Sequence, residues 1–132
     1  MAVTTLYWDL WNGPSLEEFE VPNPSWDQVK SAIDRLDADT QTAVAIEVSE
    51  ESQMLIGGGD GKFLVSCCVS EDEWLALVDN RADSTQKIHL RACGQVGCYP
   101  LNEICDYSST IKAARWYFEH STLDPSLDWS RD

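Results

Sequence analysis

A glycine-rich segment in the middle of the chain places the strongest limit on its fold. Residues 57–61 have the sequence Gly-Gly-Gly-Asp-Gly. Glycine at this density indicates a backbone that needs positive φ angles or a close approach to neighbouring atoms. The flanking segments are rich in β-branched and aromatic residues, which favour strands. The segment therefore predicts the tight turn of a β-hairpin whose second strand, residues 62–69, is a central strand of one sheet.

Further strands and two helices are predicted around this hairpin. Ser25 and Gln28 form a capping-box pattern, and apolar residues at helical spacing follow, so a helix is expected over residues 26–36. A second apolar stripe predicts a helix over residues 109–120. The strands expected from β-propensity and alternation cover residues 4–11, 42–48, 53–57, 62–69, 73–79, 85–91 and 96–101. Residues 16–21 fit either an edge segment or an ordered loop, and a short helix is the alternative for residues 73–79.

The order of these elements predicts the fold class. A helix, a run of consecutive short strands joined by tight turns, and a second helix are typical of an α+β fold with an antiparallel β-meander. We expect the N-terminal and the C-terminal helix to pack on this sheet. The tail, with Leu123, Leu127 and Trp129, is expected to pack down as well. Residues 1–132 are expected to form a single domain, since the length is typical of one.

The charge of the chain argues against two kinds of partner. The formal net charge is −14, and residues 1–80 hold 16 of the 23 acidic residues but only three of the nine basic ones. Nucleic acids and anionic membranes require basic surface, so binding to either is not expected. The charge suits either solubility alone or a basic protein partner. The chain has no run of about 18 apolar residues and no secretory signal, which predicts a cytoplasmic protein without a membrane span.

Signatures of enzymes, cofactors and metals are scarce, and we expect none of the three. The glycine-rich segment joins two strands and lacks the Lys-Ser/Thr pair and the helix start of a phosphate-binding loop. A zinc site is the alternative for four residues whose spacing departs from the usual Cys-x-x-Cys pairs: His89, Cys93, Cys98 and Cys105. Buried, reduced thiols are the simpler interpretation of the cysteines. A small enzyme that uses Cys98 or Cys105 is a further alternative.

Two acidic turns form the main candidate binding site. Alternate turns of a meander lie at the same end of the sheet, so residues 49–52 and 70–73 are expected to come together. The candidate residues are the acidic Glu47, Glu50, Glu51, Glu71, Asp72 and Glu73 and the aromatic Trp11 and Trp74. Aromatic residues dominate the energetics of interfaces, which makes the two tryptophans candidate anchors beside the acids. The alternatives are two unrelated solvated turns and two tryptophans of the core.

The middle and the end of the chain carry landmarks of a known family. These are the glycine run at 57–59, the Gly-Lys-Phe-Leu-Val-Ser segment at 61–66, Trp74 followed by Leu-Val-Asp at 77–79, and residues 113–119 and 123–129 near the end. Over residues 42–129 the chain resembles immunity protein family 1 of bacterial polymorphic toxin systems. Members of that family usually end in a Trp-Glu pair, whereas Trp129 is followed by Ser130 here.

The resemblance implies both a fold and a function. It implies an α+β inhibitor without catalytic residues that neutralises a toxin encoded next to it, and many of these toxins are deaminase-like. The expected partner is a basic, nucleic-acid-modifying toxin domain, which this acidic monomer would occlude in a 1:1 heterodimer. The His-x-Glu and Pro-Cys-x-x-Cys signature of zinc deaminases is absent, so the chain itself is not expected to be the toxin. The alternative is an acidic DNA mimic that inhibits a nuclease or another DNA-binding protein.

Overall fold

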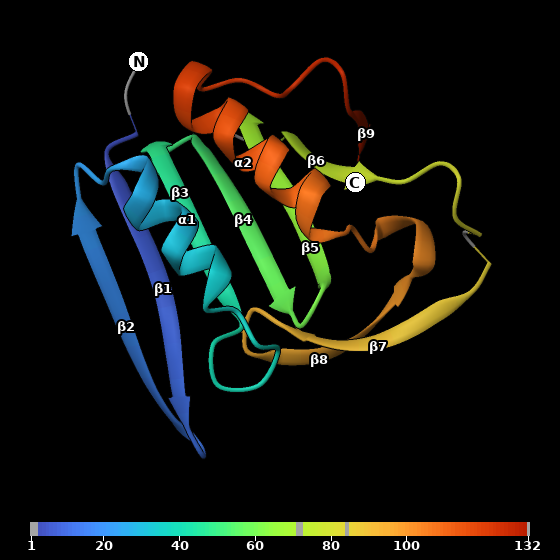
Figure 1. Ribbon diagram of the computed structural model, residues 1–132, viewed down its shortest axis with the longest axis horizontal. Helices are drawn as coiled ribbons and strands as arrows, with labels where there is room; N and C mark the ends of the chain where they lie inside the picture. Colours follow the sequence, from blue (N-terminus) through green and yellow to red (C-terminus); the bar gives the residue numbers. More distant parts are fainter. Residues whose placement is uncertain (1–2, 71–72, 84, 132) are drawn as a thin grey trace.

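Seven strands form one antiparallel sheet that organises the whole molecule (Figure 1). The computed structural model describes residues 3–70, 73–83 and 85–131. The strands follow the order β2-β1-β3-β4-β5-β6-β9 across the sheet. Their bounds are β1 (Thr5–Asn12), β2 (Ser15–Pro22), β3 (Ala43–Ser49), β4 (Ser52–Gly59), β5 (Lys62–Ser70), β6 (Glu73–Val78) and β9 (Asp128–Arg131). Each neighbouring pair is antiparallel, which confirms the predicted α+β class and its meander sheet.

Two helices cover the same face of this sheet (Figure 1). Their bounds are α1 (Trp26–Asp34) and α2 (Tyr107–His120). The capping box at α1 is confirmed, because the Ser25 hydroxyl accepts a hydrogen bond from the Gln28 N–H and the Gln28 side chain accepts one from the Ser25 N–H. α1 ends two residues before its predicted limit. α2 begins two residues earlier than predicted, because Asp106 caps it by accepting a hydrogen bond from the Ser109 N–H at 2.8 Å.

The core lies between the two helices and this face of the sheet. One row of directly paired, buried side chains runs across four strands: Leu6, Ile46, Met54 and Cys67. From the helices, Val29, Ile33 and Tyr117 pack onto the same cluster and are themselves fully buried. Each large apolar side chain removed from water in this way contributes about 1.5–3 kcal/mol to folding.

The glycine-rich segment forms the predicted hairpin turn between β4 and β5. Gly58, Gly59 and Gly61 have φ angles of 97°, 139° and 80°, a range that glycine adopts without steric cost. At Gly59 the chain that follows α1 comes so close that a Cβ atom would lie 2.5 Å from the Asp37 nitrogen. Gly59 therefore provides close packing against the chain after α1, whereas Gly61 provides the turn alone.

A second hairpin lies outside the main sheet, which corrects the expectation that residues 85–101 continue the meander. Its strands are β7 (Lys87–Ala92) and β8 (Gln95–Pro100), which form a separate two-stranded sheet. The place beside β6 is taken instead by β9, where Trp129 pairs with Leu77. The tip of the β7–β8 hairpin is held against the sheet, since the Thr42 carbonyl accepts a hydrogen bond from the Cys93 N–H at 3.0 Å.

The structure decides between the alternative predictions for residues 16–21 and 73–79. Residues 16–21 belong to the edge strand β2, and residues 73–78 form strand β6 rather than a helix. The tail packs against the core through Leu123, Leu127 and Trp129, as predicted. A 3-10 turn, η1 (Leu101–Glu103), follows β8. Among the described residues, no helix is long and apolar enough to cross a membrane.

Candidate functional site

The two acidic turns lie at the same end of the sheet. β3, β4, β5 and β6 are consecutive antiparallel neighbours, so the β3–β4 and β5–β6 connections share one end. Glu50 and Glu51 occupy the first connection and are exposed. The second connection contains Glu71 and Asp72, which lie outside the described residues, and is followed by Glu73 at the start of β6. We call the surface made by Glu47, Glu50, Glu51 and Glu73 the acidic end.

A cross-strand row places Glu47 and Trp74 on one face of the sheet. Glu47 pairs with Gln53, Gln53 with Cys68, and Cys68 with Trp74. Directly paired side chains share a face, and alternation puts this row opposite Cys67, which faces the helices. We call this side, opposite α1 and α2, the helix-free face. Three strand spacings separate Glu47 from Trp74, so their backbones lie about 14 Å apart. Both residues are half-buried.

The charges at the acidic end are only partly neutralised. Glu73 forms an ion pair with Arg131 of β9, with 2.7 Å between Oε2 and Nη2. By contrast, Glu47, Glu50 and Glu51 form no ion pair with any residue that the structure describes. Carboxylates of this kind are solvated in the isolated protein and can steer and contact a basic partner.

Trp11 lies at the other end of β1, away from the acidic turns. Thr5 of β1 pairs with Glu47, and Trp11 is six residues further along the strand, about 20 Å from that row. The Trp11 ring lies 5.5 Å from the Arg91 guanidinium, and its indole N–H donates to the Asp9 carboxylate at 2.9 Å. Of the two candidate tryptophans, only Trp74 is therefore placed beside the acidic end, while Trp11 contacts the β7–β8 hairpin.

A buried carboxylate, not predicted from the sequence, connects the hairpin tip to the sheet. Asp9 is 8 % exposed and accepts hydrogen bonds from the Thr42 N–H at 2.7 Å, the Ala43 N–H at 2.9 Å, the Thr42 hydroxyl and the Trp11 indole. The Thr42 hydroxyl in turn accepts a hydrogen bond from the Gly94 N–H at 2.8 Å. The available signal was a charged residue inside an otherwise apolar strand, but its partners lie more than 30 positions away.

The residues of the zinc alternative are divided between the β7–β8 hairpin, which holds His89, Cys93 and Cys98, and the segment after η1, which holds Cys105. Among the described residues, no group of three or more His, Cys, Asp or Glu side chains is placed to hold a metal ion. His89 pairs with Cys98 across the β7–β8 hairpin, whereas Cys105 forms an isolated bridge with Phe63 of β5. Burial, followed by the charge of Asp106, raises the pKa of Cys105 to about 12. The Cys105 thiol is therefore protonated at neutral pH, which is unfavourable for a nucleophile or a metal ligand.

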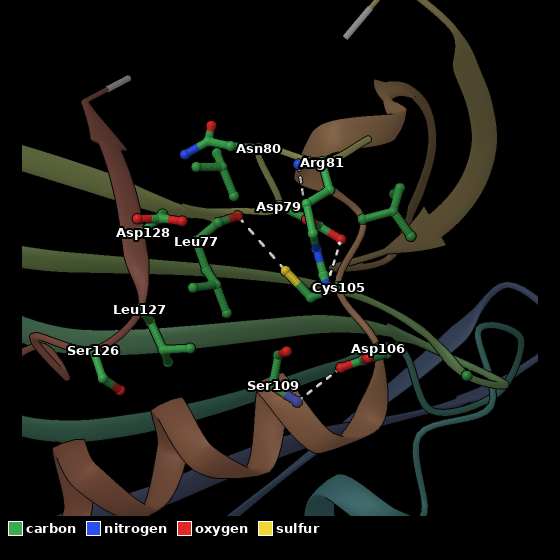
Figure 2. A pocket seen from close by; sticks show the side chains of 13 residues that line it. Leu77, Asp79, Asn80, Arg81, Cys105, Asp106, Ser109, Ser126, Leu127 and Asp128 are labelled. Carbon is green, nitrogen blue, oxygen red and sulfur yellow. Dashed lines mark hydrogen bonds and ion pairs between the residues drawn. The ribbon is translucent and has the colours of Figure 1, made fainter. Parts of the chain in front are cut away.

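A hollow of about 370 Å³ lies where β6, β9 and the start of α2 meet (Figure 2). Its main charged groups have partners within the protein. The Arg81 Nε atom lies 2.9 Å from the Asp79 carboxylate, and Asp106 caps α2. Hydrogen bonds from Arg81, first from its side chain and then from its backbone, lower the pKa of Asp79. The Cys105 thiol donates to the Leu77 carbonyl at 3.6 Å. These contacts give Asp79, Arg81, Cys105 and Asp106 structural roles.

The fold is that of a small α+β protein, with one sheet face covered by helices and the other covered in part by the β7–β8 hairpin. Residues 17–131 match the model of the family described as Immunity protein Imm1. The chain therefore belongs to this family and is an immunity protein directed against a toxin. The predicted resemblance is confirmed and covers more of the chain than its landmarks do. A comparison with curated proteins found no match.

Proposed function

We propose that this immunity protein neutralises its cognate toxin by covering the toxin's substrate-binding site with the acidic end and the adjoining helix-free face. The observation that carries the proposal is the row that sets Trp74 and Glu47 on one face, beside the exposed Glu50 and Glu51. An aromatic anchor next to unpaired carboxylates favours a basic protein partner. Glu71 and Asp72 belong to the proposed surface by their place in the sequence.

The proposed partner is a deaminase that acts on nucleic acid. An enzyme that binds nucleic acid needs basic groups to contact phosphates. The acidic residues of the immunity protein complement such a surface, and the family resemblance supports a deaminase-like toxin. In this proposal the immunity protein acts without catalysis or cofactor and binds as a monomer in a 1:1 heterodimer. Its place of action is the cytoplasm, where its free cysteines stay reduced.

Co-expression with the toxin encoded beside this gene tests the proposal directly. The expected results are restored growth of cells that produce the toxin and a single 1:1 complex on size-exclusion chromatography. Purified immunity protein should also abolish deamination of a nucleic-acid substrate by the toxin. Failure to restore growth together with the absence of a complex would contradict the proposal.

A pair of charge reversals tests the acidic end in particular. Glu51→Lys changes an exposed residue of the β3–β4 turn, whereas Asp39→Lys makes the same charge change at an exposed residue near the β4–β5 turn, at the opposite end of the sheet. We expect Glu51→Lys to lower the association rate constant about tenfold and Asp39→Lys to lower it by less than about threefold. Stopped-flow fluorescence measures both. Equal effects of the two variants would show that only the net charge matters.

The DNA-mimic alternative makes a different prediction in the same assays. A protein that imitates DNA inhibits unrelated DNA-binding proteins, because it presents phosphate-like charges without a matched partner. We expect instead that an unrelated nuclease stays active in the presence of the immunity protein at concentrations that fully inhibit the cognate toxin. Inhibition of both enzymes at similar concentrations would favour the DNA mimic.

A further inference from the structure

The helix-free face contains an apolar groove that the acidic end does not explain. This groove has a volume of about 270 Å³ and lies between the edge strand β2 and the tip of the β7–β8 hairpin. Its main apolar lining residues are Tyr7, Trp11, Leu16, Ala43, Ala45 and Leu55, and Asp9, Glu18 and Cys93 also line it. Pockets that bind drug-sized molecules range from about 300 to about 1,000 Å³. The groove is therefore better matched to one large protein side chain than to a small molecule.

The strand register explains why the groove exists. Ala45 of β3 lies between two large neighbours, because it pairs with Tyr7 on one side and with Leu55 on the other. A methyl group between a tyrosine and a leucine leaves a depression in the sheet surface, since directly paired side chains stand side by side. One step along, Gly57 makes room for the hairpin, whose Ala92 Cβ would lie 2.8 Å from a Cβ at that position. The hairpin therefore fills the space above Gly57, while the depression above Ala45 stays open.

The border of the groove is acidic on its exposed side. Leu16 is 44 % exposed, and Glu18, on the same face of β2, also lines the groove. Glu20 is the next residue of this face, and it pairs with Tyr7. Neither Glu18 nor Glu20 forms an ion pair with a described residue. On the opposite side of the groove the Arg91 guanidinium lies over the Trp11 ring, so its positive charge already interacts with the indole.

Acidic residues on an edge strand have a general explanation, since charges prevent pairing with strands of other molecules. That explanation accounts for Glu18 and Glu20, but it does not account for a half-exposed leucine beside an open apolar depression. Hot spots of protein interfaces combine a pocket for one large side chain with a polar rim that excludes water. The combination of apolar floor, exposed Leu16 and unpaired acids matches that pattern.

We propose that this groove is the anchor pocket for the toxin and receives one aromatic or long aliphatic side chain from a Lys/Arg-bearing segment of it. This inference rests on the proposed function and adds a second contact region to the same face. The anchor controls how long the complex lasts, because a desolvated apolar contact acts mainly on the dissociation rate. The acidic end controls how fast the complex forms, because unpaired charges act mainly on association.

A larger side chain at Ala45, in the sheet surface that forms the groove, tests the anchor pocket. Ala45→Leu adds three carbons between Tyr7 and Leu55, and we expect it to raise the dissociation rate constant of the complex with the neighbouring-gene toxin domain about tenfold. The association rate constant should change by less than about threefold. Surface plasmon resonance measures both, and thermal unfolding confirms that the variant is folded. A folded Ala45→Leu protein with wild-type dissociation would overturn the inference.

A matched pair of variants on β2 tests the groove without relying on correct folding of the Ala45→Leu variant. Glu18→Lys changes the charge on the helix-free face, and Glu17→Lys makes the same change one residue away on the opposite face. We expect Glu18→Lys to weaken binding about tenfold and Glu17→Lys by less than about threefold. Equal effects of both variants would contradict a contact at the groove.

The identity of the occupant is tested by a double-mutant cycle between the groove and the toxin. Alanine variants of the exposed aromatic and long aliphatic residues of the toxin are combined with Ala45→Leu. We expect one toxin variant whose loss of affinity is not additive with that of Ala45→Leu, which identifies the anchor. Additive losses throughout, or a free immunity protein that dimerises until Ala45→Leu disrupts the dimer, would overturn the inference. If the wild-type protein binds no toxin at all, the proposed function fails instead.

Discussion

Asp9 shows how one residue couples three parts of the structure. Its buried carboxylate accepts hydrogen bonds from β1, through the Trp11 indole, and from the start of β3, through Thr42 and Ala43. Thr42 extends the network to Gly94 at the hairpin tip. A buried carboxylate is tolerated only when donors surround it, because desolvation of an unpaired charge is costly. The groove wall formed by Trp11 therefore depends on Asp9, which lines the same groove and is 8 % exposed.

We predict that Asp9→Asn destabilises the protein by about 2–3 kcal/mol, because the amide group must turn its N–H donors toward the donors that the carboxylate satisfied. Urea unfolding monitored by tryptophan fluorescence measures this change. Asp39→Asn, at an exposed position, is the control and should change stability by less than about 0.5 kcal/mol. Equal stability of Asp9→Asn and the wild-type protein would show that the network contributes little.

Tyr117 makes the free energy of unfolding depend on pH in the alkaline range. Burial raises the pKa of its hydroxyl to about 12, although the hydrogen bond with Ser52 at 2.7 Å acts in the opposite direction. Because the pKa in the folded state is raised, this contribution is complete below about pH 10 and is lost as the pH rises toward about 12. Tyr117→Phe should be about 1 kcal/mol less stable than wild type near neutral pH. We expect this gap to narrow above about pH 10, as measured by urea unfolding; a constant gap would contradict the prediction.

At the scale of elements, the β4–β5 hairpin depends on glycine for two separable reasons. At Gly59 a Cβ would lie within 2.6 Å of three backbone atoms of Leu36 and Asp37, whereas at Gly61 it would meet nothing within 4 Å. We predict that Gly61→Ala costs about 1 kcal/mol, the penalty of a positive φ angle alone. Gly59→Ala should cost about 3 kcal/mol or prevent folding, since the approaching backbone must move. Thermal unfolding measures the stability of both variants. Equal losses of stability would contradict two separate roles for the two glycines.

The elements that the sequence predicted are those with local signals. The capping box of Ser25 and Gln28 and the glycine turn act within a few residues, so both could be read directly. The position of the β7–β8 hairpin and the pairing of β9 with β6 depend instead on which segment competes best for the edge of the sheet. Of residues 128–131 (Asp-Trp-Ser-Arg) only Trp129 is typical of strands, so their pairing with residues 75–78 is not evident from propensity.

The candidate site also has a part that the sequence predicts and a part that depends on the three-dimensional fold. Glu47 and Trp74 could be expected near the acidic turns, because the alternation of turns in a meander follows from strand order. For Trp11 only the residue type favours a place in the site, and its position about 20 Å away follows from the direction of β1. The groove at Ala45 required the exact register of three strands. A small residue that lies between large residues of neighbouring strands cannot be recognised from the sequence until the strand register is known.

At the scale of the whole molecule, the distribution of basic residues leaves most of the acidic end without ion pairs among the described residues, with Glu73 as the exception. Lys30, Arg81, Arg115 and Arg131 each form an ion pair with a nearby carboxylate. Arg35 stacks on Trp8, and Arg91 on Trp11. Six of the nine basic residues are thus engaged locally, while the protein keeps a net charge of −14. A field of this sign extends into solvent and raises the encounter rate with a positively charged molecule.

This field predicts how salt affects the complex with the toxin. Raising the ionic strength from about 0.02 M to about 0.5 M shortens the Debye length from roughly 20 Å to about 4 Å, so steering between the surfaces is lost. We expect the association rate constant to fall at least about tenfold, while the dissociation rate constant, governed by the apolar groove, changes by less than about threefold. Stopped-flow association and dissociation by competitor chase measure the two constants. An association rate that does not respond to salt would mean that the acidic surface serves solubility alone, and the contact with the toxin would then have to be apolar throughout.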